Sequence, residues 1–178
     1  TSFGYWGGGK SPGGVRSLIC RLDYSNDSAN TLSKGPLSAV RYFGSATGDA
    51  SFGYFTGIDW PAVPSTIERL DFSNDTTTAS PKGNLETALY AMGTVSAKEN
   101  GLPQTSIAAP VQPPFPYPQQ LPAPGPAHGY FGGGRYPSAG NYSIVDRVDY
   151  SNDTATASLR GNLTTSPRGH GGTGNKEY

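Results

Sequence analysis

One seven-residue segment occurs three times in this chain. It reads RLDYSND at residues 21–27, RLDFSND at residues 69–75 and RVDYSND at residues 147–153. Similar residues flank each occurrence, which indicates that the chain consists of copies of a longer unit. A repeated unit of this kind is one structural element that stacks on its neighbours, and this constrains the fold more than any other feature of the sequence.

The three copies span residues 1–50, 51–101 and 128–178, so each is about 50 residues long. Residues 102–127 separate the second copy from the third, are dense in proline and carry no charge. Proline-rich segments favour the extended polyproline II conformation, so we expect a linker or a projecting arm here. Its PPFPYP stretch could also dock in an aromatic groove of a partner.

Each copy contains four short strand candidates, in a chain with 25 Gly, 16 Pro and 11 Tyr. Gly and Pro punctuate turns, whereas Tyr, Thr, Val and Ile favour strands. In chain order the candidates are residues 4–6, 53–55 and 129–131; residues 19–24, 67–72 and 145–150; residues 29–37, 77–85 and 155–163; and residues 40–48, 89–97 and 166–174. We therefore expect an all-β chain in which each copy forms one four-stranded antiparallel blade.

The order of these elements resembles the kelch repeat, in which a glycine doublet is followed by a strand and a downstream Pro–Leu segment. The glycines of GYWGGG and GYFGGG, the heptads and KGPL at residues 34–37 carry this resemblance. A period near 50 residues is typical of kelch blades. The chain departs from the kelch pattern in the third strand, where kelch repeats usually have Trp and this chain has Ala, Thr or Ser. A closer resemblance is to repeat arrays in virion structural and fibre proteins of large tailed phages of cyanobacteria. It is carried by the segments GYFGGG and DRVDYSNDTATAS and by the RG that follows them.

The resemblance implies a β-propeller-type fold with a proline-rich insertion. It also implies a structural role, as a subunit of a self-assembling extracellular or virion fibre that contacts a host surface. Propellers typically need four to eight blades, so three copies leave two open flanks. We therefore expect the chain to associate with copies of itself, either as a closed ring or as a filament.

The repeated heptad combines a strand with a turn. Alternation along the strand puts Arg69 and Asp71 on one face and Leu70 and Phe72 on the other, and the Asn–Asp pair that follows suits a turn. Catalytic groups normally occur once, in an asymmetric cleft, so residues present in every copy predict a structural role rather than an enzyme or a cofactor site. This structural cassette comprises Arg21, Asp23, Asn26, Asp27, Arg69, Asp71, Asn74, Asp75, Arg147, Asp149, Asn152 and Asp153.

Two further readings concern the surface. Five asparagines fit the N-glycosylation acceptor pattern, namely Asn26, Asn74, Asn141, Asn152 and Asn162. The alternative function is a carbohydrate-binding, lectin-like module, because aromatic rings in loops can stack on surface glycans. Trp60, Tyr136 and Tyr142 follow the glycine clusters and are the candidates for such contacts.

The charge pattern disfavours several partners. The 13 basic and 13 acidic residues cancel, and no basic stripe suits the neutralisation of nucleic-acid phosphates. No apolar run approaches the roughly 20 residues of a membrane helix, so we expect no membrane insertion. His128 and His170 have no neighbours at metal-ligand spacing, and no metal site is predicted.

Overall fold

The computed structural model describes residues 3–59, 61–96 and 128–166. The described part of the chain consists of short strands, with two one-turn 3₁₀ helices, η1 (Tyr24–Asn26) and η2 (Phe72–Asn74), and no α-helix. The prediction of an all-β chain is confirmed. Two other predictions lie outside the described residues: the proline-rich segment at 102–127 and nearly all of the last strand candidate at 166–174.

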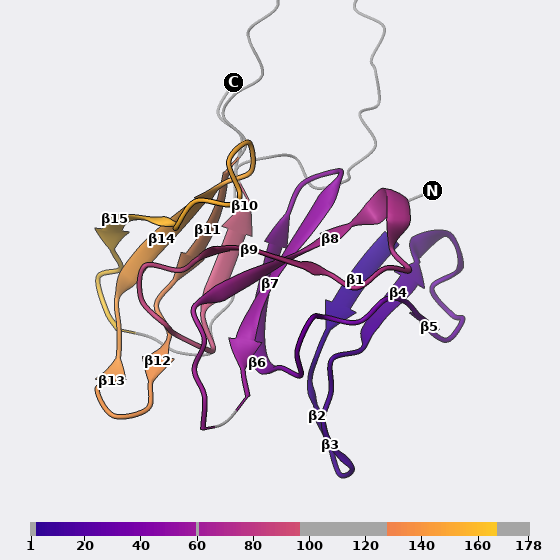
Figure 1. The fold of residues 1–178 in the computed structure, drawn as a ribbon, viewed down its shortest axis with the longest axis horizontal. Helices are drawn as coiled ribbons and strands as arrows, with labels where there is room; N and C mark the ends of the chain where they lie inside the picture. Colours follow the sequence, from indigo (N-terminus) through magenta and orange to yellow (C-terminus); the bar gives the residue numbers. More distant parts are fainter. Residues whose placement is uncertain (1–2, 60, 97–127, 167–178) are drawn as a thin grey trace, which may run out of the picture.

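Three antiparallel sheets follow one another in a row along the molecule (Figure 1). The first has the order β1 (Phe3–Gly7), β4 (Ile19–Asp23), β5 (Leu32–Ser33). The second has the order β6 (Tyr42–Gly48), β7 (Phe52–Ile58), β8 (Thr66–Asp71), β9 (Ser80–Asn84). The third has the order β10 (Gly93–Ser96), β11 (His128–Gly132), β14 (Ile144–Asp149), β15 (Ser158–Asn162).

Two small hairpins lie outside these sheets. They pair β2 (Lys10–Ser11) with β3 (Gly14–Val15), and β12 (Arg135–Tyr136) with β13 (Gly140–Asn141). Both extend from the same end of the sheets, beyond the glycine clusters that close β1 and β11 (Figure 1).

The sheets do not coincide with the copies of the repeat. The strand predicted as the fourth of the first copy is β6, and it pairs with β7 of the second copy; β10 of the second copy likewise pairs with β11 of the third. For β6, a tight turn explains why it pairs with the next copy. Asp49 accepts hydrogen bonds from the backbone N–H groups of Ser51 (2.7 Å) and Phe52 (2.9 Å), which closes a tight turn and makes β6 and β7 neighbours.

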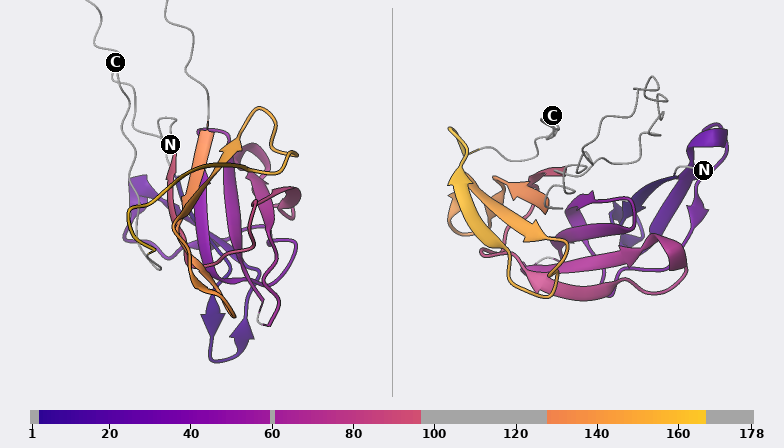
Figure 2. Two further views of the ribbon diagram at one scale, coloured as in Figure 1. Left: turned by 90° about the vertical axis from the view of Figure 1, so that its left-hand side faces the viewer. Right: turned by 90° about the horizontal axis from the view of Figure 1, so that it is seen from above.

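Each four-stranded sheet therefore contains three strands of one copy and the last strand of the copy before it. The first sheet has three strands, and among the described residues no strand covers the outer edge of β1. The row of sheets is curved, and the described residues form no closed ring (Figure 2).

The hydrophobic core lies between successive copies. One cluster joins the first copy to the second and consists of Ile19, Leu37, Phe55, Leu70 and Ala79. The other joins the second copy to the third and consists of Tyr54, Ile67, Leu85, Leu89, Met92, Phe131, Val148, Tyr150 and Ala157. Because each copy buries its apolar residues only against a neighbour, the copies stabilise one another as in other repeat proteins.

Candidate functional site

The last aspartate of the second heptad binds the first copy through three side chains. The Asp75 carboxylate accepts hydrogen bonds from the Tyr5 hydroxyl at 3.0 Å and from the Arg21 guanidinium at 2.7 Å. The Lys34 ammonium lies 3.1 Å from its other oxygen. All three donors come from the first copy, from β1, β4 and the residues that follow β5.

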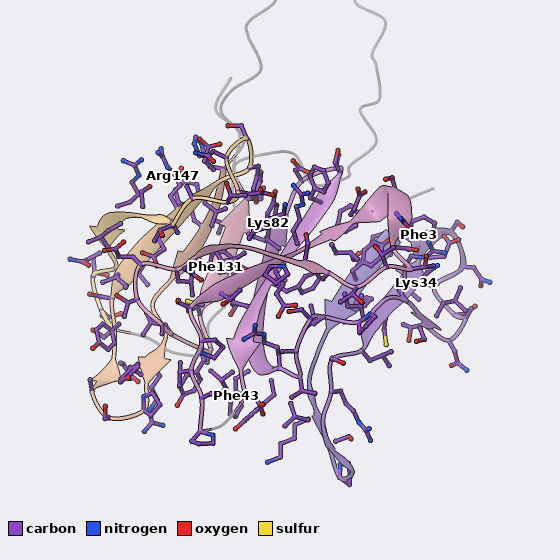
Figure 3. All side chains as sticks on the ribbon, in the orientation of Figure 1. Phe3, Lys34, Phe43, Lys82, Phe131 and Arg147 are labelled. Atoms are coloured by element: carbon purple, nitrogen blue, oxygen red, sulfur yellow. The ribbon has the colours of Figure 1, made fainter. Side chains whose placement is uncertain are left out.

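The same contact recurs between the second copy and the third. Asp153 accepts from the Tyr54 hydroxyl at 3.2 Å and from the Arg69 guanidinium at 2.5 Å, and the Lys82 ammonium lies 3.8 Å away. Lys34 and Lys82 hold corresponding places in successive sheets (Figure 3). We call each of these two contacts a joint.

Each joint pairs a buried carboxylate with partly buried cations. The Asp75 side chain is only 8% exposed. Burial acts to raise the pKa of this carboxyl, but the Lys34 ammonium, the Tyr5 hydroxyl and the Arg21 guanidinium act against it, and the net pKa is lowered. Burial beside the carboxylate raises the pKa of Tyr5. Asp75 is therefore a carboxylate at neutral pH, and its charge is compensated by two cations.

Aromatic stacking and close backbone contact complete each joint. Phe72 stacks on Tyr5 with ring centroids 4.6 Å apart, and Tyr150 stacks on Tyr54 at 4.8 Å. The N–H of Gly35 donates to the Asp75 carbonyl at 2.8 Å in the first joint.

Glycine is required at this backbone contact. A Cβ atom on Gly35 would lie 1.9 Å from the Thr77 carbonyl oxygen, and one on Gly83 would lie 1.7 Å from that of Ala155. Neither distance is physically possible for a side chain. The glycine that recurs in KG and RG after the heptad therefore serves the contact between copies.

The other aspartate of each heptad has a local role. Asp71 caps η2: its carboxylate accepts from the N–H of Ser73 at 2.9 Å and from the Ser73 hydroxyl at 2.6 Å. These bonds lower its pKa. Asp23 with Ser25 and Asp149 with Ser151 repeat the geometry.

The asparagines of the cassette also act within their own turns. The side-chain oxygens of Asn26, Asn74 and Asn152 accept from the hydroxyl two residues later, at 3.2–3.3 Å. Arg21 and Arg69 thus each pair with the last Asp of the next heptad, Asp75 and Asp153, and not with the Asp on their own strand. Asp75 ends η2 within the predicted turn, but its carboxylate, like that of Asp153, bonds to the preceding copy and not to its own loop.

The sequence pattern does not identify two members of each joint. It places Tyr5 and Tyr54 in the first strand candidates and Lys34 and Lys82 in the third, without predicting their contact with the heptad. Repetition was the available signal. The position of Tyr5 and Tyr54 is also a tyrosine in the third copy, Tyr130, and the position of Lys34 and Lys82 is also a cation there, Arg160.

A second buried acid position lies on β8 of the second sheet and on β14 of the third, whereas Cys20 holds this position in the first sheet. Glu68 is fully buried and binds the Arg41 guanidinium at 2.7 Å. In the next copy Asp146 occupies this position, and its Oδ2 accepts from the backbone N–H of Glu86 at 3.0 Å, whereas its Oδ1 is buried without a hydrogen-bond partner. Burial raises the pKa of Asp146 to about 6.

The predicted surface residues are placed as follows. The five glycosylation candidates, Asn26, Asn74, Asn141, Asn152 and Asn162, are all exposed. Tyr136 is exposed on β12, whereas Tyr142 packs against the core between the second and third sheets. Trp60 lies outside the described residues. The structure thus does not bring Tyr136 and Tyr142 together as an aromatic surface.

Within the described ranges, no group of three or more His, Cys, Asp or Glu side chains is arranged to hold a metal ion. No helix in that part of the chain has the length and hydropathy needed to cross a membrane. No protein-family model and no curated protein sequence matches the chain.

Proposed function

We propose that this chain is a non-enzymatic structural repeat protein, a subunit of a self-assembling extracellular or virion fibre that contacts a host surface. The observation that carries the proposal is the use of the repeated residues. In both joints they bind the neighbouring copy, and the interior of the molecule is formed by contacts between copies. A unit whose most characteristic residues bind the next unit is suited to assembly.

The charge distribution supports this proposal. An aspartate of the following copy pairs with each of the cations that recur in the first two copies, namely Arg21, Lys34, Arg69 and Lys82. A kelch-like, propeller-type arrangement fits the antiparallel four-stranded sheets and the exchange of one strand between successive copies. Closure of such a ring requires more sheets than the three that the described residues form.

The proposal is tested by measuring the mass and shape of the purified chain. Light scattering and electron microscopy should reveal particles larger than the 18.6 kDa monomer, either rings or filaments. A compact monomer that persists up to millimolar concentration would contradict the proposal.

A lectin-like function is the second candidate, and an aromatic cluster with one exposed ring, Phe43, favours it. Phe43 is 59% exposed, stacks with Tyr90 at 5.9 Å between centroids and adjoins Tyr42 at 4.9 Å. Phe43 has a left-handed φ of 47°, as does Ala91 (54°) at the same position of the next copy, so the backbone there does not require the ring. Binding of glycans that is lost in Phe43→Ala and kept in Tyr136→Ala would support this candidate.

A further inference from the structure

The two joints are repeats of one interface with a receiving half and an inserting half. The receiving half is a Tyr, an Arg, a Lys and a Gly of one copy, as in Tyr54, Arg69, Lys82 and Gly83. The inserting half is the aspartate turn and the preceding aromatic ring of the next copy. The described residues contain two filled joints, and one receiving half and one inserting half have no partner among them.

The third copy carries the remaining receiving half. Its members are Tyr130, Arg147, Arg160 and Gly161. The Nε of Arg147 is buried without a hydrogen-bond partner. A Cβ atom on Gly161 would meet no heavy atom within 4 Å, whereas at Gly83 it would collide with the inserted turn. Arg147 lies on the outer side of the third sheet, at the opposite end of the row from Phe3 (Figure 3).

Apolar residues around this receiving half are also less covered than their counterparts. Ile67 and Leu85 of the second copy are 1% and 2% exposed, because the third copy packs on them. Val145 and Leu163 hold the same positions in the third copy and are only partly buried.

The first copy carries the remaining inserting half. Asp27 is exposed, whereas Asp75 and Asp153 are buried. Tyr24, which corresponds to the stacked rings Phe72 and Tyr150, is 56% exposed.

Trp6 shows the same difference. It is 54% exposed, whereas Phe55 and Phe131, at the corresponding positions, are 5% and 1% exposed. The open edge of β1 lies in this same first copy; in the other two sheets the preceding copy covers that edge with β6 or β10.

We propose that the first copy of one molecule docks on the third copy of another, so that Asp27 of the inserting molecule is bound by Tyr130, Arg147 and Arg160 of the receiving molecule. The partner is a second copy of this chain, because the two ends are complementary in charge, ring stacking and backbone shape in the way that the internal joints already are. Tyr24 stacks on Tyr130, and the turn after it lies over Gly161. The proposal rests on the proposed assembly function and specifies the surfaces that perform it.

Such a contact joins two different surfaces, so it propagates from chain to chain. Each molecule contributes one inserting end and one receiving end, and the joint is incomplete within a single molecule. Blocking either end alone therefore stops self-association, whereas two molecules blocked at opposite ends can still form one joint.

The experiment uses two full-length variants. Asp27→Arg places a cation against Arg147 and Arg160 and blocks the inserting end. Gly161→Val places a side chain where the inserted turn would lie and blocks the receiving end; the described part of the chain leaves this site open, so the monomer should fold and melt as the unmodified chain does. Asp59→Arg is the control, because Asp59 is an exposed aspartate of the second copy, outside both ends.

Sedimentation velocity should show dimers or larger species for the unmodified chain and for Asp59→Arg. Each blocked variant alone should be monomeric, with self-association weakened on the order of 100-fold. An equimolar mixture of the two should form dimers and nothing larger.

Three outcomes would overturn the inference, and they distinguish a wrong interface from a wrong assembly function. Self-association of either blocked variant at the strength of the unmodified chain, or a mixture that stays monomeric while the unmodified chain assembles, would exclude this interface and leave the assembly function standing. An unmodified chain that is monomeric at every concentration would exclude both.

Discussion

At the scale of single residues, Asp146 is the clearest case of a carboxyl group without adequate compensation. Glu68, at the same position of the preceding copy, is neutralised by Arg41. The residue that corresponds to Arg41 in the second copy is Leu89, so Asp146 has only backbone N–H donors. Burial consequently raises its pKa to about 6. A carboxyl whose folded pKa lies above its unfolded value of 3.8 favours folding when it is protonated.

The Asp146 carboxyl therefore costs stability as the pH rises from about 4 to about 6, and the cost is constant above that range. Asp146→Asn removes the titration. The melting temperature of Asp146→Asn minus that of the unmodified chain should be near zero at pH 3.5, should rise between pH 4 and 6 and should stay positive at pH 7. A difference that is independent of pH would contradict the assigned ionisation.

The residue scale also shows what the sequence could not resolve. Both aspartates of the heptad recur in every copy, so repetition predicts that each has a structural role but not which one. Asp71 and Asp75 are four residues apart, and only the geometry of η2 directs the first into its own turn and the second toward the preceding copy. Contacts of this kind depend on sheet packing, which a local pattern does not encode.

At the scale of elements, the glycine clusters that end the first strand of each copy are not uniform. Gly133 has a left-handed φ of 65°, and its N–H donates to the Ile144 carbonyl at 2.8 Å. A Cβ atom on Gly132 would lie 3.6 Å from its nearest neighbour, an ordinary contact, and Thr56 stands at this position in the second copy. Of Gly132 and Gly133, Gly133 is thus the one whose backbone requires glycine; Gly134, which follows, also has a left-handed φ of 109°.

Gly133→Ala should therefore lower the free energy of unfolding by about 1–2 kcal/mol, the usual cost of a left-handed alanine. Gly132→Ala should change it by no more than about 0.5 kcal/mol. Urea denaturation of both variants in dilute solution measures the difference. Equal losses would mean that the cluster is needed for close packing as a whole.

The strands also show what a sequence pattern can predict: it locates each strand but does not determine which strands pair. Alternation and turn residues locate the strands well, because strand formation and tight turns are local properties. The pairing of β6 with the next copy was not foreseen, since the strand order within a repeat does not say to which sheet an edge strand adds. The short turn at Asp49 was the available signal: a tight turn between two strand candidates makes them neighbours.

At the scale of the whole molecule, stability comes from the interfaces between copies. Both hydrophobic clusters and both joints cross from one copy to the next. The ends of the row therefore differ from its interior in exposure although they share its sequence. Asp27, Asp75 and Asp153 hold the same position of the same heptad, and within the described part of the chain the last two are bound by a preceding copy.

These three aspartates allow the central claim, that the heptad exists to join copies, to be tested directly. The measurement is the free energy of unfolding of Asp27→Asn, Asp75→Asn and Asp153→Asn, each made in the Gly161→Val background so that the chain remains monomeric. Asp75→Asn and Asp153→Asn each leave two partly buried cations without their carboxylate and should lose roughly 3 kcal/mol. Asp27→Asn, in an exposed turn, should lose no more than about 0.5 kcal/mol. Equal losses at all three positions would show that the aspartate serves its own turn, and would contradict the account.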